Sequence, residues 1–327
     1  MRWDIALDIG ESGVRMATRE KGVVLNDFSL AAFRGGSLIA MGDEAVEMLG
    51  RAPRDVRFSR PMSNGRVVDS QLIRLWVNYA LGGFSGKLRR PNVALAITEL
   101  MPESDLFTLS TAILEADTAQ CGFINAGMAA ALGASLNILD PAGTLLLYIG
   151  AGIINASVIS YGRTVVSRVL PYGLSRVDAD IIDIVRERMA LRIGPRTAEE
   201  LKIHLGSAVA GLESSQDTAG IDMETGFPVE KRVSAQLIRA ALLALGRSIA
   251  ALALSAVERA PGELAVDIIE SGITLAGGGA QLLGLDQLLT DLTGLTCRVA
   301  PDPALCVING AHKALGTGEY SQLVAEC

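Results

Sequence analysis

The chain has 327 residues, of which 50% are hydrophobic and 20% charged, so it encodes a folded protein and disorder is excluded as its main state. The length predicts two domains of about 150 residues each. A net charge of −7 provides no positive field for general nucleic-acid binding, and two histidines with four cysteines in no C-x-x-C spacing predict reduced thiols and no metal site.

Apolar periodicity predicts alternating strands and helices, which indicates α/β layers. In the first half we expect strands at 5–10 and 21–24, helices at 72–81 and 106–119, and a strand at 93–97. In the second half we expect strands at 145–150, 154–160 and up to residue 169, then helices at 175–189 and 197–206, an exposed hairpin or loop within 211–232, and a long aliphatic helix ending near Arg259.

Two features bear on the cellular compartment. The long apolar tract at 238–257 is interrupted by Arg239, Gly246 and Arg247, so we expect a buried core helix and not a membrane span. The chain enters an apolar strand at Ile5 with no leader-like segment before it, which predicts a cytoplasmic protein.

The two halves of the chain resemble each other at an offset of 140 residues. Gly10 matches Gly150 and Gly22 matches Gly162, each pair lying in the same strand, turn, strand pattern. This spacing is too long for a solenoid repeat, so it indicates duplication into two related domains.

Glycine turns follow apolar strands at three places, where backbone amides can approach an anion because no Cβ intervenes. They are Gly10, the Gly150 and Gly152 turn, and the run Gly277, Gly278 and Gly279. None fits the phosphate-loop or dinucleotide fingerprints. Two of them are related by the repeat, which favours a nucleotide held between two domains.

Many segments, in their order and spacing, resemble the MreB family of bacterial actin homologues, within the actin, hexokinase and heat-shock 70 superfamily. These segments are 21–26, 42–50, 60–69, 128–133, 197–202, 206–207, 277–280, 302–307 and 313–315. The resemblance implies duplicated actin-like (ribonuclease H-like) α/β domains flanking a nucleotide cleft. Domain I is expected at 1–140 plus 306–327, and domain II at 141–305 with a small subdomain at about 179–240.

The resemblance also assigns nucleotide contacts, with ATP or ADP and magnesium as the possible cofactors. The phosphate contacts would come from Asp8 and from the glycines of the first two turns. Gly277, Gly278 and Gly279 would lie under the adenosine, and Glu199 and Lys202 would contact the base and ribose. An exposed i,i+3 pair on a helix is the alternative interpretation of Glu199 and Lys202.

The departures from the family pattern concentrate in this cleft. The first family loop reads Asp-Leu-Gly-Thr-Ala-Asn-Thr, but here Glu11 follows Gly10. A carboxylate facing inward would repel phosphates, whereas one facing outward would be an ordinary turn residue, and both remain open. In the second loop Tyr148 replaces the acid that would orient metal-bound water, and Ile153 replaces a threonine that would position the attacking water. Asn125 stands where the family has a glutamate associated with hydrolysis.

These losses predict weak or absent ATP hydrolysis, with no catalytic residue to assign, because phosphoryl transfer to water needs metal charge and an oriented nucleophile. Our leading hypothesis is therefore a filament-forming, cell-shape scaffold related to MreB, a pseudo-ATPase. The alternatives are an active ATP-dependent filament protein and a non-polymerising adaptor for a membrane protein.

The expected partners are further copies of the chain or an MreB paralogue, cell-shape membrane proteins and the inner face of the cell membrane, with no nucleic acid. Phe84, Leu88 and Arg89 lie in the loop that some family members insert into the membrane, where apolar insertion and basic charge would act together. A solvated loop is the alternative.

Overall fold

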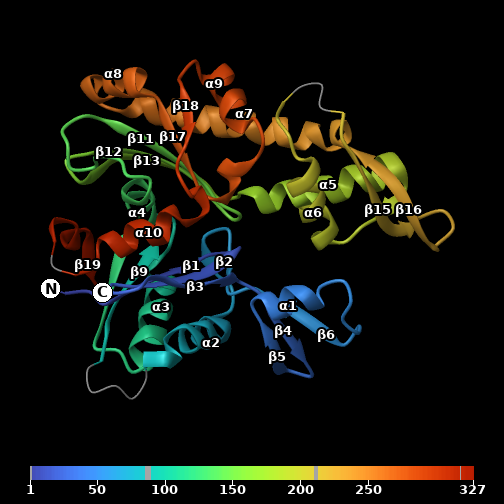
Figure 1. Ribbon diagram of the computed structural model, residues 1–327, viewed down its shortest axis with the longest axis horizontal. Coiled ribbons are helices and arrows are strands. Elements are labelled where there is room, and N and C mark those ends of the chain that lie inside the picture. The colour runs from blue at the N-terminus through green and yellow to red at the C-terminus, as the bar shows by residue number, and fades with distance from the viewer. Residues whose placement is uncertain (1, 85–89, 210–212, 317) are drawn as a thin grey trace.

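The computed structural model describes residues 2–84, 90–209, 213–316 and 318–327. Two large sheets lie on opposite sides of a central pair of helices, and smaller units extend from both sheets toward one end of the molecule (Figure 1). The helices and strands of the first half are β1 (Ile5–Ile9), β2 (Gly13–Thr18), β3 (Gly22–Phe28), β4 (Ala31–Arg34), β5 (Ser37–Met41), α1 (Asp43–Met48), β6 (Val56–Ser59), β7 (Met62–Ser63), β8 (Arg66–Val67), α2 (Ser70–Leu81), β9 (Asn92–Ile97), α3 (Glu103–Glu115), β10 (Gln120–Asn125) and α4 (Ala126–Gly133).

The second half has a matching set of elements. They are β11 (Thr144–Ile149), β12 (Ile154–Ser160), β13 (Arg163–Leu170), α5 (Leu174–Met189), β14 (Leu191–Arg192), α6 (Pro195–Leu205), β15 (Ser215–Asp222), β16 (Pro228–Ser234), α7 (Ala235–Arg259), α8 (Gly262–Ser271), β17 (Ile273–Ala276), α9 (Leu285–Thr293), β18 (Cys297–Val299), α10 (Cys306–Lys313) and β19 (Val324–Glu326).

The topology confirms the duplication. The first sheet has the order β3-β2-β1-β9-β10 and the second the order β13-β12-β11-β17-β18, each an antiparallel meander followed by two parallel strands. The first sheet gains β19, which pairs antiparallel with β10. Even the turns agree, since Gly22 and Gly162 adopt φ values of 68° and 67°, a conformation that costs glycine little.

Most predicted elements are present with small shifts at their ends. The helix expected at 106–119 is α3, which begins and ends earlier than predicted. It follows Pro102, an N-cap residue in the extended conformation, and Asp117 has a left-handed φ of 58° just beyond its end. The segment 211–232, for which a hairpin or a loop was expected, contains most of the β15–β16 hairpin.

Helix α7 is the element that carries the long apolar tract. Within the described part of the chain it is long and apolar enough to cross a membrane, but half of that window is buried inside the protein. Its buried side chains, among them Ile238, Leu245 and Ile249, join the core of the second half. The expectation of a core helix is confirmed.

The central pair of helices, α4 and α10, joins the two halves. A Cβ on Gly133 would overlap the backbone of Cys306, and a Cβ on Gly310 would overlap the backbone of Ala129. The helices therefore touch through main-chain atoms. The core around them combines side chains from both sheets, including Ala6 from β1 and Leu146 from β11.

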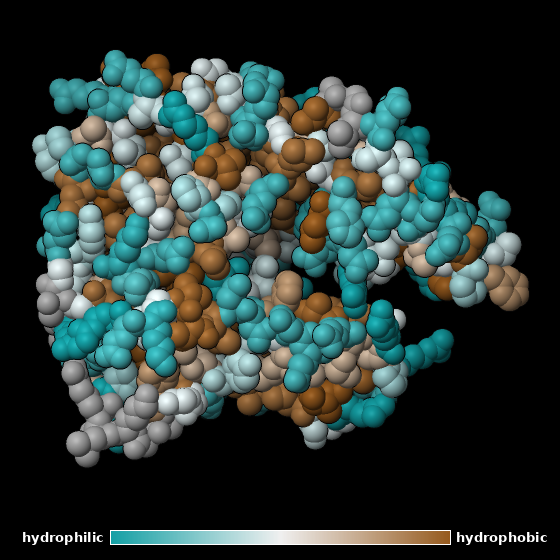
Figure 2. Space-filling model, in the orientation of Figure 1, coloured by the Kyte–Doolittle hydropathy of each residue, from teal (hydrophilic) through white to brown (hydrophobic). Residues whose placement is uncertain are grey.

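Each large sheet carries a small unit. In the first half this unit is the β5-β4-β6 sheet with α1, and in the second half it is the β14-β15-β16 sheet with α5 and α6. Both lie at the same end of the molecule in Figure 1, and the surface is hollowed between them in Figure 2. The hollow leads toward the glycine turns.

Candidate functional site

A cavity of about 550 Å³ lies between the two halves, lined by both large sheets, α6 and the loop after β17. Among the residues predicted to bind nucleotide, the structure brings eight to its walls: Asp8, Gly10, Gly150, Gly152, Glu199, Lys202, Gly278 and Gly279. Gly277 instead approaches the backbone of Ile149, donates its N–H to the Pro303 carbonyl at 2.7 Å, and shapes the turn beneath the cavity.

The two glycine turns that face each other across the cavity have the same backbone geometry. Gly10 N–H donates to the Gly13 carbonyl and Gly150 N–H donates to the Ile153 carbonyl, both at 2.9 Å. The second turn also supports α5, because Leu174 N–H donates to the Gly150 carbonyl at 3.1 Å. A Cβ on Gly173 would collide with that turn, so glycine is required there.

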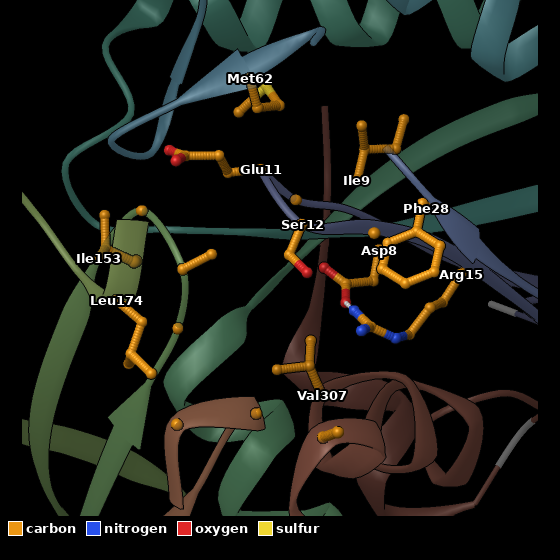
Figure 3. A pocket seen from close by; sticks show the side chains of 18 of the residues that line it. Asp8, Ile9, Glu11, Ser12, Arg15, Phe28, Met62, Ile153, Leu174 and Val307 are labelled. Atoms are coloured by element: carbon orange, nitrogen blue, oxygen red, sulfur yellow. Dashed lines mark hydrogen bonds and ion pairs between the residues drawn. The ribbon is translucent and has the colours of Figure 1, made fainter. Parts of the chain in front are cut away.

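An ion pair lies in the first half of the cavity. Arg15 Nη1 donates to Asp8 Oδ2 at 3.2 Å, and the two side chains are only 17% and 14% exposed (Figure 3). Burial raises the pKa of Asp8 and the Arg15 charge opposes that rise. Arg15 was not predicted from the sequence. Residues equally far from a tight antiparallel turn face each other, and this places Arg15 on β2 opposite Asp8 on β1.

Tyr148 occupies the position where the family resemblance implied a second acid. It packs partly buried against the core between the halves, and burial followed by the nearby Asp8 charge raises its pKa. Its phenol is therefore neutral at physiological pH. Neither Asp8, which is paired, nor the neutral residue at position 148 therefore offers a free carboxylate.

Glu11 lines the cavity wall beside the second glycine turn, with its carboxylate against Gly152. Its Oε2 accepts a hydrogen bond from Asn64 N–H at 2.7 Å, and its Oε1 accepts one from Ser175 Oγ at 2.6 Å. In Figure 3 the side chain extends away from Asp8. The carboxylate thus joins the first half to the start of α5 in the second half, a contact that the sequence did not predict.

The β7–β8 hairpin covers the second glycine turn. Its two-residue turn has left-handed φ values of 50° at Asn64 and 74° at Gly65. A Cβ on Gly65 would lie 2.9 Å from Ile153 Cγ2, so glycine permits close approach to that side chain. Ile153 is only 7% exposed. The side chain that replaces the expected threonine is an apolar contact between the halves.

A second ion pair lies at the other end of the cavity. Lys202 Nζ donates to Asp178 Oδ2 at 2.8 Å, and the lysine side chain is 8% exposed. Burial is the main cause that raises the pKa of Asp178 to about 6, with Lys202 lowering it and Glu199 raising it. Lys202 is thus a buried partner of α5, which does not fit the exposed helix pair considered from the sequence.

Asn125 caps α4. Its Oδ1 accepts a hydrogen bond from Met128 N–H at 2.9 Å, and its Nδ2 donates to Glu99 Oε1 at 3.0 Å. An N-cap amide satisfies helix amides that lack intrahelical partners. Where the resemblance implied a hydrolytic glutamate, the side chain has a structural role.

The side chains at the two glycine turns do not fit a magnesium ion, and the other carboxylates on the cavity wall are those of Asp27, Asp43 and Glu199. Within residues 2–84, 90–209, 213–316 and 318–327, no group of three or more histidine, cysteine, aspartate or glutamate side chains could hold a metal. Asp8 is paired with a guanidinium, Tyr148 is neutral, and the Glu11 carboxylate already accepts two hydrogen bonds. Magnesium prefers free carboxylates with bound water.

The residues expected to contact the membrane are only partly described. Phe84 packs partly buried against the core of the first half, and Leu88 and Arg89 lie outside the described residues. The neighbouring Arg90 Nε pairs with Asp117 Oδ1 at 2.7 Å. At Phe84 and Arg90 the side chains therefore make contacts within the protein.

Comparison with known proteins identifies the family. The model of the MreB/Mbl protein family matches residues 2–322. The cell shape-determining protein MreB of Escherichia coli is 32% identical over 322 residues, covering 95% of this chain and 93% of that protein. The cell shape-determining protein Mbl of Bacillus cereus is 30% identical over 320 residues, covering 96% and 94%.

A solved structure gives the same answer. MreB5 of Spiroplasma citri bound to ADP superposes with a TM-score of 0.92 at 32% identity, covering 99% of this chain and 98% of that one. The same protein bound to AMPPNP gives a TM-score of 0.89. With the duplicated sheets, the paired glycine turns and these relatives all in agreement, the chain belongs to the MreB/Mbl family of actin-like proteins.

Proposed function

We propose that the chain is a cytoskeletal scaffold subunit with a role in cell shape, which binds nucleotide in its cleft and has little or no ATP hydrolysis. The relatives are named for determining cell shape, and a structural neighbour binds ADP and AMPPNP in its solved structures. The cavity between the glycine turns has room for a nucleotide, since ligand pockets typically measure about 300–1,000 Å³.

The observation that carries the loss of hydrolysis is the pair of side chains in the second glycine turn. Tyr148 is neutral and supplies no carboxylate to orient metal-bound water, and Ile153 has no hydroxyl and is buried beneath the β7–β8 hairpin. Loss of positioning groups costs phosphoryl transfer orders of magnitude in rate.

Phosphate release under single-turnover conditions, at high protein concentration with ATP and magnesium, tests this proposal. We expect release no faster than in buffer. The Escherichia coli MreB is the matched positive control, and a rate comparable to the rate measured for that relative would make the chain an active ATP-dependent filament protein.

Self-assembly is the second part of the proposal. Apolar side chains are exposed on both small units: Ile39 on β5, Ile203 on α6 and Phe227 in the β15–β16 hairpin. Sedimentation and electron microscopy with and without nucleotide measure assembly. A chain that stays monomeric in both would be an adaptor for another protein rather than a filament subunit.

We also propose peripheral binding to the inner face of the cell membrane through the loop after α2. Flotation with anionic liposomes measures this, and Phe84→Ser tests the apolar part of the contact. Because Phe84 packs on the core, the thermal unfolding midpoint of the Phe84→Ser variant must be measured together with its liposome binding. Equal binding by the wild type and a stably folded Phe84→Ser, or no binding by either, would remove Phe84 from the contact.

A further inference from the structure

Glu11 places a negative charge between the two glycine turns. Its carboxylate lies against Gly152 so closely that a Cβ there would overlap Oε2. The donors around it come from the β7–β8 hairpin at Asn64 and from the first turn of α5 at Ser175. The Arg60 guanidinium donates to the Glu11 carbonyl at 2.7 Å and holds the same loop.

This is the space that an anion held by both turns would occupy. Backbone amides at paired glycine turns and a hydroxyl at the start of a helix are groups that bind phosphate in other proteins. Here the Ser175 hydroxyl at the start of α5 already donates to Glu11, and the second donor to that carboxylate is the Asn64 N–H of the β7–β8 hairpin. A phosphate entering between the turns would face the Glu11 carboxylate at close range and would have to displace its hydrogen bonds.

The cation beside the first glycine turn is also part of the chain. Arg15 lies beside Asp8 on the adjoining strand, mostly buried and on the wall of the same cavity. A guanidinium has five donors in a planar fork and binds phosphate oxygens as well as carboxylates, so one side chain can serve both Asp8 and a phosphate. Its charge is paired with Asp8, so that carboxylate is not free to hold a magnesium ion.

We propose that the cleft binds a nucleoside diphosphate without a divalent cation and discriminates against the triphosphate, with Glu11 filling the place of the terminal phosphate and Arg15 supplying positive charge. The proposal rests on nucleotide binding, which is itself proposed above. The proposal makes Glu11 a specificity-determining residue. It predicts that the nucleotide stays bound as a ligand and is not hydrolysed.

Equilibrium titration with ADP and with AMPPNP, in excess magnesium and in EDTA, tests the proposal. For the wild type we expect ADP to bind at least about tenfold more tightly than AMPPNP, and EDTA to change the ADP affinity less than about twofold. Glu11→Thr removes the charge, and we expect it to bring the two affinities to within about threefold by improving AMPPNP binding.

Two further variants separate charge from folding. Glu11→Gln keeps a carbonyl that can accept from Asn64 N–H, so it should fall between the wild type and Glu11→Thr. Glu20→Thr removes an exposed carboxylate at the far end of β2 and should leave both affinities unchanged. The thermal unfolding midpoint of each variant, measured without nucleotide, shows that it is folded.

The outcomes distinguish the two proposals. Equal wild-type affinities for ADP and AMPPNP, an unchanged ratio in folded Glu11→Thr, or loss of ADP binding in EDTA would overturn this inference and leave nucleotide binding intact. No binding of either nucleotide by any variant would overturn both.

Discussion

The two glycine turns share one backbone but differ in charge. In the first, the facing pair across the hairpin is Asp8 and Arg15, an ion pair, and Glu11 follows the glycine. In the second, the equivalent pair is Tyr148 and Asn155, both uncharged, and Asn155 Nδ2 donates to Ser167 Oγ at 3.0 Å. Duplication preserved the turn geometry in both halves, whereas only the first turn carries an ion pair between the facing residues of its two strands.

The largest expected effect comes from breaking the charged pair. Arg15→Met leaves Asp8 mostly buried with no cation, so we expect the free energy of unfolding to fall by about 3 kcal/mol at pH 7. Urea denaturation measures it. Arg34→Met is the matched control because its pair with Asp55 is more than half exposed, and we expect a far smaller loss there. Equal losses of unfolding free energy in the two variants would mean that burial of the Asp8 pair does not increase the cost of removing its cation.

Placing a charge in the uncharged turn is the reciprocal change. Tyr148→Asp puts a second carboxylate near Asp8 in a poorly solvated position, so we expect a loss of about 2 kcal/mol in the free energy of unfolding at pH 7. The loss should shrink at pH 5, where the added group is more readily protonated. Tyr148→Phe keeps the ring and serves as the control, and a pH-independent loss would argue against the electrostatic explanation.

The hairpin that covers the second turn gives a smaller effect. Gly65→Ala forces a Cβ onto a left-handed residue and toward Ile153, and we expect a loss of about 1.5 kcal/mol. Gly36→Ala has a φ of 86° but open space around its Cβ, so it measures the backbone cost alone. The difference between the two variants is the contribution of the contact with Ile153, and a difference of zero would contradict that contact.

The smallest expected effect on stability concerns the ion pair of the second half, Lys202 with Asp178. The pKa of Asp178 is raised to about 6 from 3.8, so the folded state binds a proton more tightly than the unfolded state does. The contribution of this group to stability is therefore present at low pH and is lost as pH rises through about 6. We expect wild-type stability to gain about 1 kcal/mol from this group between pH 7.5 and 5. Asp178→Asn should lack that gain in urea denaturation at the two pH values, and an unchanged pH dependence would refute it.

Sequence reasoning succeeded where the physical cause is local. The strands around Gly10 and Gly150 and the helix α7 follow from apolar periodicity and glycine spacing, which neighbouring residues determine. Arg15 was within reach too, because a tight antiparallel turn sets which residues face each other.

The remaining features depend on distant parts of the chain. Glu11 and Ser175 are separated by 164 residues, and their contact exists only because the two halves pack against each other. For the same reason the sequence shows that residue 11 carries a charge, but it does not show which way the Glu11 side chain points. Lys202 resembled an exposed helix residue until α5 supplied Asp178 as a buried partner.

The backbone contact between α4 and α10 has a mechanical consequence. Gly133 and Gly310 bring the backbones of the two helices into direct contact, so neither helix can move toward the other at these positions. Opening of the cleft would then have its fulcrum at this end, with the greatest travel at the small units on the opposite end (Figure 1). A single methyl group added at Gly310 would act as a wedge at that fulcrum and change the aperture of the cavity without touching any residue that lines it.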